Sequence, residues 1–498
     1  MIYVAVVVAY VVLLLGISFH KSRSVKSSDD FMVAGRNVPV YMLVATLVCT
    51  WVGSGSLFAS AGLTFRTGIS ALWFSAGAWM GILVVYLIAG RVRRIAQYTL
   101  TDLLEKRYSP VAKLLGTITI IIAYMVIAGY QFKGGGRFIS ILSEGSISPE
   151  TGMLIAAGLI IGFTVLAGMV SIVSIDIFNG SIMLVAMTLA LPFAVFANGG
   201  VAEVWNAIGQ AEPQHFSVFG GNDFFWVAGI ILPSFLLLLS ESSIYQKFSS
   251  ASSEGGARKA VLGMFFGVIL VELLMVAIAL VGFGIYADDP RFFLADGSLN
   301  RGMAEEIILR IGYEQLPAII GALLLAAGAA ILISTGNTFL IVTSTNVTRD
   351  IFQAYFFRDA RPRQLIWIQR ACIVVIGALA YLFMSQFQTI LEMALVSYTM
   401  IGASLAPALL AAFFWKRVTR VAGVASIASG MLTVLGIVFV NFMFKGSPQG
   451  AQILGVQFPI DMDYIALPAV TVSTLTLIVV SLLTEKPREE DWAGFIET

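Results

Sequence analysis

The sequence predicts an all-α integral membrane protein with thirteen transmembrane helices. Of its 498 residues, 58% are hydrophobic and 12% are charged, and the mean hydropathy is +0.90. A soluble domain carries about 25% charged residues, so the composition excludes a cytosolic enzyme and a disordered chain. The 30 Lys and Arg residues nearly balance the 29 Asp and Glu residues, which argues against a basic surface for nucleic acid. Alternating apolar segments of about ten residues, typical of a membrane barrel, are absent from the sequence.

Thirteen stretches of the chain satisfy the length rule for a transmembrane helix, which is about 20 mostly apolar residues. They cover residues 2–19, 40–62, 70–90, 112–141, 152–168, 173–197, 225–246, 260–285, 316–345, 364–385, 390–414, 421–443 and 463–483. Hydrocarbon offers the backbone no hydrogen-bond partners, so each segment must satisfy its own N–H and C=O groups. We therefore expect every one of these stretches to be helical.

The distribution of basic residues predicts how the chain is oriented. No basic residue precedes the first apolar stretch, which argues against a signal peptide. Basic residues follow it instead, at Lys21, Arg23, Lys26 and Arg36. Because loops rich in Lys and Arg stay in the cytoplasm, we expect the N-terminus outside. Thirteen crossings then put the C-terminus in the cytoplasm and leave the outer loop 198–224 without Lys or Arg. The expected location is the cell membrane, plasma or inner.

Two of the apolar stretches contain residues that weaken a helix at mid-membrane. Residues 51–56 read Trp-Val-Gly-Ser-Gly-Ser, and each glycine costs about 1 kcal/mol relative to alanine. An alternative interpretation is a small-residue face for close helix packing. Residues 239–243 read Leu-Ser-Glu-Ser-Ser, and a buried charge such as Glu241 must face a cavity or a partner. Five spans separate the two sites, which predicts an inverted five-helix repeat core with broken first and sixth core helices.

The ninth span places several oxygen-bearing side chains on one helix face. Ser334 and Thr338 are four residues apart, Asn337 is three residues from Ser334, and Thr335 lies at the edge of this face. Neutral hydroxyls and carbonyls from a broken helix would suit a hard monovalent cation. The alternative is ordinary back-bonding of Ser and Thr to the preceding turn of the helix.

Motifs spread over nearly the whole chain resemble the sodium/solute symporter family. They are Ser28–Arg36, Thr50–Gly55, Ala167–Ser171 with Asp176, Gln246-Lys247, Ser334-Thr335, Asp350–Phe352, and Ala406–Leu410 leading to Phe414–Arg417. The resemblance implies a leucine-transporter-type core over residues 38–420. A leading helix and inner loop (1–37) precede this core, and two trailing helices with a cytoplasmic C-terminus (421–498) follow it.

The resemblance also implies where Na⁺ binds. One sodium site would use the carbonyls of Cys49, Val52 and Ile331 with the hydroxyls of Ser334 and Thr335. Some members have a second sodium site, whose positions match Asp176, Ser334, Asn337 and Thr338. Asn337 stands where those members have serine. A different interpretation of Asp176 is a helix N-cap.

The solute site is predicted from Trp51, Ser56 and Glu241 at the helix breaks and from Gln131, a polar residue in the middle of the fourth span. Trp51 matches a substrate-contacting tryptophan of the family's choline transporters, and an aromatic face attracts a cation. A cationic or amine-bearing solute follows, unless Trp51 only packs and Glu241 only bonds its neighbouring serines.

We therefore expect a sodium-coupled symporter that imports a small polar organic solute by alternating access. Its partners would be the solute, Na⁺ and the lipid bilayer, and a monomer would be the functional unit. A channel or solute sensor with the same fold is the alternative. An enzyme is not expected, because His20 and His215 are the only histidines and both fall in loops.

Overall fold

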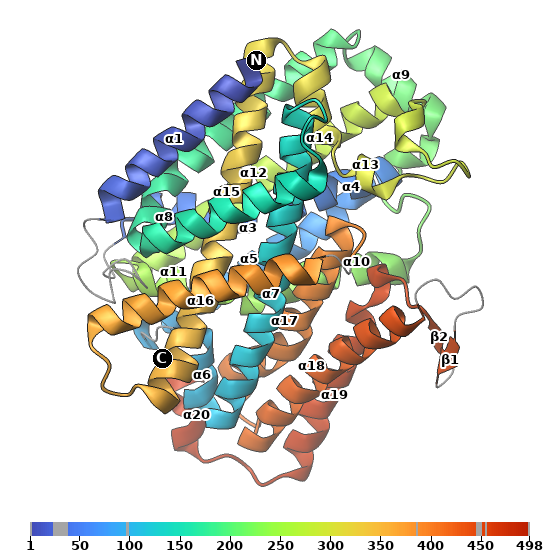
Figure 1. Ribbon diagram of the computed structural model, residues 1–498. Coiled ribbons are helices and arrows are strands. Elements are labelled where there is room, and N and C mark those ends of the chain that lie inside the picture. The colour runs from blue at the N-terminus through green and yellow to red at the C-terminus, as the bar shows by residue number, and fades with distance from the viewer. Residues whose placement is uncertain are drawn as a thin grey trace.

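The structure is a computed structural model that describes residues 2–22, 38–95, 99–384, 387–444, 451–453 and 456–496. The motif at 28–36 and the basic residues Arg23, Lys26 and Arg36 lie outside these ranges. The described chain is a bundle of helices (Figure 1). Its described strands are β1 (Ala451–Ile453) and β2 (Val456–Phe458), which pair antiparallel.

The first half of the chain supplies the leading helix and the first five core spans. Its elements are α1 (Ile2–Ser22), α3 (Val40–Trp51), the π-helix η2 (Gly55–Ala59), α4 (Ser60–Thr67), the 3-10 helix η3 (Gly68–Ala71), α5 (Leu72–Ile95), α6 (Leu100–Arg107), α7 (Pro110–Leu142) and α8 (Pro149–Ala197).

The second half supplies the remaining core spans and the trailing helices. Its elements are α9 (Val201–Ala211), η4 (Pro213–Phe216), α10 (Phe224–Ser240), α11 (Ser242–Ser250), α12 (Glu254–Tyr286), η5 (Pro290–Phe292), α13 (Arg301–Ala304), α14 (Ile307–Arg310), η6 (Ile311–Gln315), α15 (Ala318–Asn346), η7 (Val347–Phe356), α16 (Pro362–Phe383), α17 (Ile390–Phe414), α18 (Arg420–Met443), η9 (Met462–Tyr464), α19 (Ala466–Leu483) and α20 (Glu489–Ile496).

The number of spans agrees with the thirteen predicted from sequence once the turn at Gly68 is considered. By length and composition, 12 helices in the described part could cross a membrane, and α3 is a further, shorter apolar helix. Residues 55–95 count as one of the 12, but Gly68 has a φ of +65° and turns the chain between α4 and α5. Gly168, at φ +69°, divides α8 in the same way, and the two halves of α8 already count separately among the 12. When α3 is joined to α4 across their break and α5 is counted as a separate span after Gly68, the number of spans is thirteen.

Both predicted helix interruptions are confirmed. α3 ends at Trp51, and Val52 is extended with φ −75° and ψ 94° before the helix resumes at η2. α10 ends at Ser240, and Glu241 is extended with φ −73° and ψ 100° before α11 starts at Ser242. Each interruption leaves backbone groups without helical partners, which is the feature that transporter sites use.

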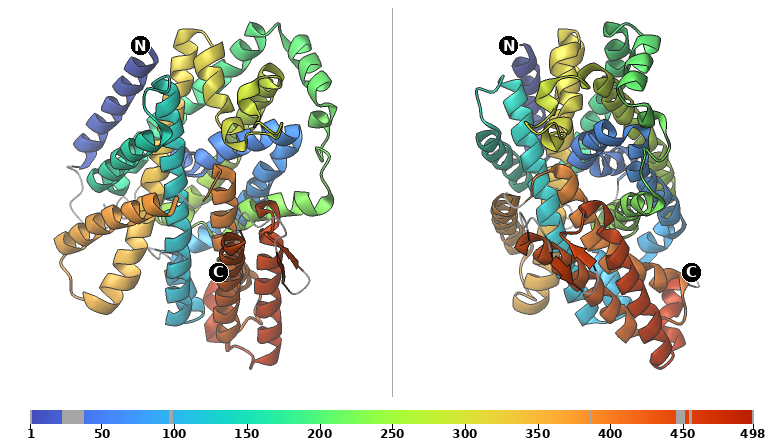
Figure 2. Two further views of the ribbon diagram at one scale, coloured as in Figure 1. Left: turned by 45° about the vertical axis from the view of Figure 1, so that its right-hand side comes forward. Right: turned by 90° about the vertical axis from the view of Figure 1, so that its right-hand side faces the viewer.

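The interior of the bundle is formed by α15 and α17, most of whose residues are buried. α1 packs against α8 and α15, whereas α18 and α19 pack against α17. Figure 2 shows α1 and the α18–α19 pair at opposite ends of the bundle. The two interrupted helices therefore lie in the core, between α1 on one side and α18 and α19 on the other. Side chains of α15 and α17 face them there.

Candidate functional site

Three oxygen atoms meet where the break after α3 faces α15. The hydroxyl of Thr335 lies 3.1 Å from the carbonyl oxygen of Cys49 and 3.1 Å from that of Val52, and it donates to both. All three residues are buried. Ile331, one turn before Thr335 on α15, is also buried. The structure thus brings together Cys49, Val52 and Thr335, with neutral oxygens that suit a hard monovalent cation.

The neighbouring hydroxyl of Ser334 points to a different group. It donates to Oδ1 of Asp176 over 2.5 Å. Thr46 donates to Oδ2 over 2.5 Å, and Asn179 donates to Oδ1 over 3.4 Å. Asp176 is fully buried in the second half of α8. It therefore lies inside a helix, and its interpretation as a helix N-cap is wrong.

Asn337 and Thr338 follow on the next turn of α15, and both are fully buried. The amide oxygen of Asn337 accepts from the hydroxyl of Thr164 over 2.9 Å. Among the described residues, neither Nδ2 of Asn337 nor the hydroxyl of Thr338 has a hydrogen-bond partner. The structure thus pairs Asp176 with Ser334 and turns the oxygen of Asn337 toward Thr164.

A buried carboxylate joins two of the residues predicted to contact solute. Nε1 of Trp51 donates to Oε1 of Glu272 over 2.8 Å, and the hydroxyl of Ser56 lies 3.4 Å from the same oxygen. Nε1 of Trp79 donates to Oε2 over 2.7 Å. The Trp51 ring also lies 6.1 Å from the ring of Tyr398 on α17. The sequence predicts solute contacts for Trp51 and Ser56, and it favours a structural pairing role for Glu272, a lone carboxylate in an apolar span, which is what the two indoles provide.

Gln131 of α7 stabilises the first helix break. Its Oε1 accepts from the backbone N–H of Ser54 over 3.1 Å and from the Ser54 hydroxyl over 2.7 Å. These bonds satisfy a donor that the restarted helix cannot satisfy itself. Nε2 of Gln131 is buried and has no partner among the described residues. Nε2 of Gln131 is therefore a hydrogen-bond donor available to a ligand beside the first break.

Glu241, in the second break, presents a hydrogen-bond acceptor, whereas Gln131 presents a donor. Oε1 of Glu241 accepts from the hydroxyls of Tyr124 and Ser243, the latter over 2.9 Å. The expected bond to a neighbouring serine is thus present, but it uses only one oxygen. Oε2 is buried without a partner among the described residues. Lys247, on the following helix α11, donates to the carbonyl of Thr46 over 3.0 Å.

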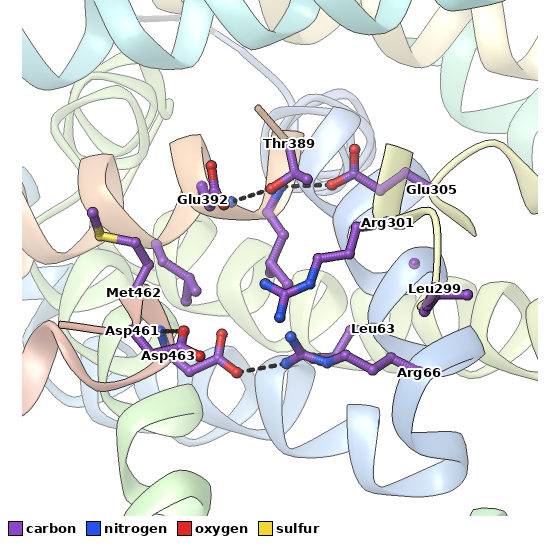
Figure 3. A pocket seen from close by; sticks show the side chains of 13 residues that line it. Leu63, Arg66, Leu299, Arg301, Glu305, Thr389, Glu392, Asp461, Met462 and Asp463 are labelled. Carbon is purple, nitrogen blue, oxygen red and sulfur yellow. Dashed lines mark hydrogen bonds and ion pairs between the residues drawn. The ribbon is translucent and has the colours of Figure 1, made fainter. Parts of the chain in front are cut away.

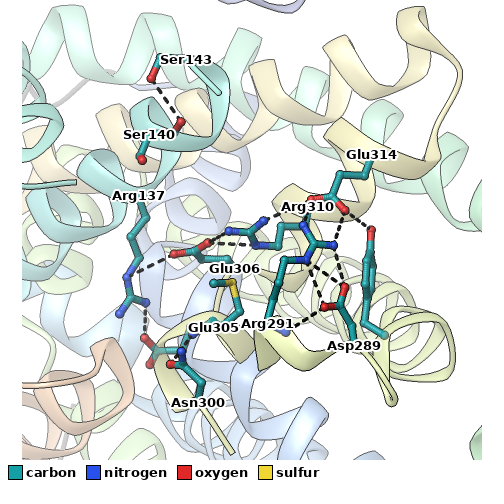
Figure 4. A network of polar contacts seen from close by, with 12 residues as sticks. Arg137, Ser140, Ser143, Asp289, Arg291, Asn300, Glu305, Glu306, Arg310 and Glu314 are labelled. Atoms are coloured by element: carbon teal, nitrogen blue, oxygen red, sulfur yellow. Dashed lines mark hydrogen bonds and ion pairs between the residues drawn. The ribbon is translucent and has the colours of Figure 1, made fainter. Parts of the chain in front are cut away.

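A network of charged side chains closes the end of the bundle where α17 begins (Figure 4). Arg137 and Glu305 form an ion pair of 2.5 Å, and both side chains are buried. Glu305 also accepts from the backbone N–H groups of Ile390 and Leu391, over 3.0 and 2.8 Å. A Cβ built on Gly62 would lie 2.7 Å from Cγ of Glu305. One carboxylate thus ties together α4, α7 and α17.

Comparisons with known proteins identify the family of the chain. Residues 31–430 match the Sodium:solute symporter family. The High-affinity proline transporter PutP of Bacillus subtilis (strain 168) is 25% identical over 493 residues, which cover 96% of this chain and 97% of that protein. The Sodium/proline symporter of Escherichia coli (strain K12) is 25% identical over 438 residues, 86% of each chain.

The fold is shared with solved transporter structures. A Na⁺-coupled sialic acid symporter in a substrate-bound outward-open state aligns with a TM-score of 0.77 at 16% identity, over 98% of this chain and 99% of that one. The nucleobase-cation-symport-1 family transporter Mhp1 aligns with a TM-score of 0.57 at 11% identity, over 93% and 97%. The predicted leucine-transporter-type fold is therefore confirmed. From the family match across most of its length, the chain is a member of the sodium:solute symporter family, a multi-pass membrane transporter coupled to sodium and not an enzyme.

Proposed function

We propose that this protein imports a small zwitterionic amino or imino acid, of which proline is the first candidate, together with sodium. The observation that carries this proposal is a pair of buried polar atoms at the two helix breaks that have no partner in the described part of the chain, Nε2 of Gln131 and Oε2 of Glu241. A buried polar atom without a partner costs about 1–3 kcal/mol, so a ligand that satisfies both is favoured. A solute carboxylate would accept from Gln131, and a solute ammonium would bind Glu241. The proline transporters among the relatives support this class of solute.

Trp51 and Ser56 complete the proposed solute site. Since the indole N–H of Trp51 is used by Glu272, the ring contributes its face and edge. An aromatic face attracts an ammonium group by about 0.5–2 kcal/mol. Ser56 adds a hydroxyl beside the same carboxylate. These contacts support an amine-bearing solute in contact with the first break.

The first sodium site would comprise the carbonyls of Cys49, Val52 and Ile331 and the hydroxyls of Ser334 and Thr335. Its support is the distance of 3.1 Å from the Thr335 hydroxyl to each of the two carbonyls of the break. Sodium would replace these hydrogen bonds and hold the interrupted helix against α15. In the second site, Asp176, Ser334, Asn337 and Thr338 would bind another ion. The unpartnered hydroxyl of Thr338 supports this assignment.

We also propose the N-terminus outside, the C-terminus in the cytoplasm, and a monomer in the lipid bilayer as the functional unit. Each inward sodium charge would gain about 2.3 kcal/mol per 100 mV of membrane potential. Residues 1–37 and 421–498 would flank a core of 38–420 that alternates between outward-open and inward-open states.

Uptake of radiolabelled L-proline into proteoliposomes tests the proposal, with inward gradients of sodium, potassium or protons imposed in turn. We expect accumulation with the sodium gradient alone. Glu241→Gln should raise the KM for proline at least tenfold, because the neutral amide cannot pair with an ammonium group. Equilibration of proline without accumulation under any gradient would favour a channel.

A pair of threonine variants on α15 tests the sodium site separately. Thr335→Ala should raise the half-saturating sodium concentration at least tenfold. Thr343→Ala is the matched control, because among the described residues its buried hydroxyl donates only to the Phe339 carbonyl of its own helix, over 2.6 Å. Unchanged sodium affinity in Thr335→Ala would end the assignment of this site.

A further inference from the structure

Positive charge gathers on the segment that joins α15 to α16, at the edge of the bundle (Figure 1). Two aspartates and five arginines fall within residues 346–370, the arginines being Arg349, Arg358, Arg361, Arg363 and Arg370. Asp350 is buried, and it accepts from the hydroxyls of Thr101 and Thr117 over 2.6 and 3.0 Å. Asp359 is exposed. The accessible part of this segment therefore carries more positive than negative charge.

Three of these arginines, Arg358, Arg361 and Arg363, form what we call the arginine surface. All three are exposed, and none of them forms an ion pair with a described residue. A guanidinium without a carboxylate partner offers a fork of N–H donors that fits a phosphate group through two parallel hydrogen bonds. The arginine surface therefore suits an anion with phosphate oxygens.

Arginines elsewhere in the chain show a different arrangement. Arg94, at the end of α5, pairs with Glu254 over 2.8 Å although both side chains are exposed. Arg66, on α4, pairs with Asp463 over 2.5 Å (Figure 3). These guanidinium groups are neutralised within the chain. The charge of the arginine surface is instead left for a partner outside the chain.

Exposed aromatic side chains lie on both sides of the arginine surface. Tyr355 and Phe356 end η7, and Phe357 follows them in the turn. Trp367 is exposed near the start of α16, and the guanidinium carbon of Arg370 lies 5.5 Å from the centroid of its ring. Aromatic rings with one apolar and one wet side gather at the level of the lipid headgroups. The arginine surface therefore lies at the boundary between hydrocarbon and water.

The outward face of α16 continues from this boundary as an apolar stripe. α16 is one of the helices long and apolar enough to cross a membrane. Its exposed residues after Trp367 recur along one side of the helix, and they are Ala371, Val374, Val375, Ala378, Leu379, Leu382 and Phe383. A lipid whose headgroup binds at the start of α16 can therefore lay an acyl chain along the same helix.

Hydrogen bonds hold the base of the arginine surface in place. The backbone N–H of Phe357 donates to the carbonyl oxygen of Phe352 over 2.8 Å, and the two rings lie 6.2 Å apart. Nε2 of Gln369 on α16 donates to the hydroxyls of Ser344 and Thr345 on α15, over 3.2 and 2.8 Å. The turn and the start of α16 are thus fixed to the end of α15, so a ligand has little backbone to order when it binds.

We propose that the arginine surface binds the headgroup of an anionic phospholipid in the cytoplasmic leaflet. Arg361 and Arg363 hold the phosphate oxygens, the aromatic rings pack at the level of the glycerol, and an acyl chain follows the stripe on α16. Anionic lipids give the cytoplasmic leaflet a negative potential that attracts basic segments. The choice of leaflet rests on the orientation proposed above, whereas the site itself does not depend on the identity of the solute.

Native mass spectrometry of the full chain in detergent tests the site, with phosphatidylglycerol and phosphatidylcholine of the same acyl chains as the probes. Phosphatidylcholine carries an added positive charge, so we expect the first phosphatidylglycerol to bind at least tenfold more tightly. The double variant Arg361→Gln with Arg363→Gln should lose at least fivefold in affinity for phosphatidylglycerol. Its affinity for phosphatidylcholine should stay unchanged, which also shows that the variant is folded.

Arg94→Gln is the matched control, because it removes an exposed arginine that already pairs with Glu254. This variant should retain the wild-type preference for phosphatidylglycerol. Equal affinity of the wild type for the two lipids, or an unchanged preference in the double variant, overturns the lipid site. Neither result bears on solute uptake, which the proteoliposome assay measures separately.

The soluble headgroup glycerophosphoglycerol distinguishes a lipid from a free phosphodiester. It carries the same phosphate group but no acyl chain, so it should displace bound phosphatidylglycerol at least tenfold less well than added phosphatidylglycerol does. Equal displacement would show that a free phosphodiester suffices, and the assignment to a lipid would be wrong.

The thermal midpoint of the purified protein gives a second readout. A ligand that binds only the folded state stabilises it, so phosphatidylglycerol should raise the midpoint of the wild type and of Arg94→Gln more than that of the double variant. An equal rise in all three proteins would contradict binding at the arginine surface.

Discussion

The indole N–H of Trp51 donates to Glu272 over 2.8 Å, which joins the first helix break to the middle of α12. Trp79 donates to the other carboxylate oxygen over 2.7 Å, and only 3% of Glu272 is exposed. A charged group near the middle of a membrane helix costs about 2.5–3.5 kcal/mol, and the two indoles offset part of this cost. In return, the carboxylate fixes the plane of the Trp51 ring. Glu272 is thus placed to orient an aromatic ring that we propose contacts the solute.

Replacing Glu272 should change solute affinity more than turnover. Glu272→Gln puts an amide NH₂ against one of the two indole N–H groups, and a hydrogen bond to a charged acceptor contributes about 1.5–3 kcal/mol. We expect the KM for proline to rise roughly tenfold, which corresponds to about 1.4 kcal/mol, while kcat changes little. Initial uptake rates over a range of proline concentrations measure both constants.

Glu489→Gln, on the exposed surface of α20, is the control for this variant and should leave both constants unchanged. Loss of kcat at constant KM in Glu272→Gln would contradict the positioning role of the carboxylate.

The second proposed sodium site makes a prediction about stoichiometry. Asp176 is the acidic residue of that site, and the buried hydroxyl of Thr338 is an oxygen of the site without a hydrogen-bond partner among the described residues. We expect sodium activation of proline uptake with a Hill coefficient near two, which falls to about one in Asp176→Asn and in Thr338→Ala. Thr343→Ala, on the same helix, should behave as the wild type. A Hill coefficient of one in the wild type would leave the protein with a single sodium site.

The helix interruptions could be predicted from sequence because they are local. Glycine and serine at 53–56 weaken a helix wherever it folds, and Glu241 is costly in any lipid-facing position. The partner of Trp51 could not be predicted in this way, because Glu272 lies 221 residues further along the chain. Such contacts depend on how helices pack and rotate.

The candidate sodium ligands illustrate the same limit on α15. Ser334 and Thr335 are adjacent, and sequence reasoning assigned both to the first sodium site and Ser334 also to the second site, with Asp176. In the fold, Thr335 faces the carbonyls of the first break while Ser334 faces Asp176 of α8. Successive residues on a helix point about 100° apart, so packing of α8 against α15 decides which partner each hydroxyl meets.

The buried ion pair between Arg137 and Glu305 should contribute strongly to stability. Removing one member of a buried pair costs about 3–5 kcal/mol, because the other charge is left without compensation. Arg137→Gln should therefore lower the thermal midpoint of the purified protein markedly. The double variant Arg137→Gln with Glu305→Gln should be less destabilised than the sum of the two single variants.

The control for this pair is Arg94→Gln, which breaks a surface pair of 2.8 Å with Glu254 whose side chains are 46% and 42% exposed. Exposed pairs contribute about 0–1 kcal/mol, so its thermal midpoint should hardly move. Equal effects of Arg94→Gln and Arg137→Gln would contradict a special role for the buried pair.

His215 should make the loop between α9 and α10 sensitive to acid. Its ring is buried, stacks on Phe283 with centroids 3.9 Å apart, and places Nε2 3.1 Å from the carbonyl oxygen of Phe65. Burial lowers the pKa of His215 below its usual value of about 6.5. The folded state therefore binds a proton less readily than the unfolded state, so stability is complete above pH 6.5 and declines as the pH falls through the lowered pKa.

The measurement is the thermal midpoint of the purified protein between pH 8 and pH 5. The wild type should lose stability below about pH 6.5, whereas His215→Asn, which cannot take up a proton, should lose less over the same interval. His20→Gln changes an exposed histidine at the end of α1 and should keep the wild-type profile. If His215→Asn and the wild type decline in parallel, acid sensitivity arises from other groups and the buried imidazole does not anchor the loop in its neutral form.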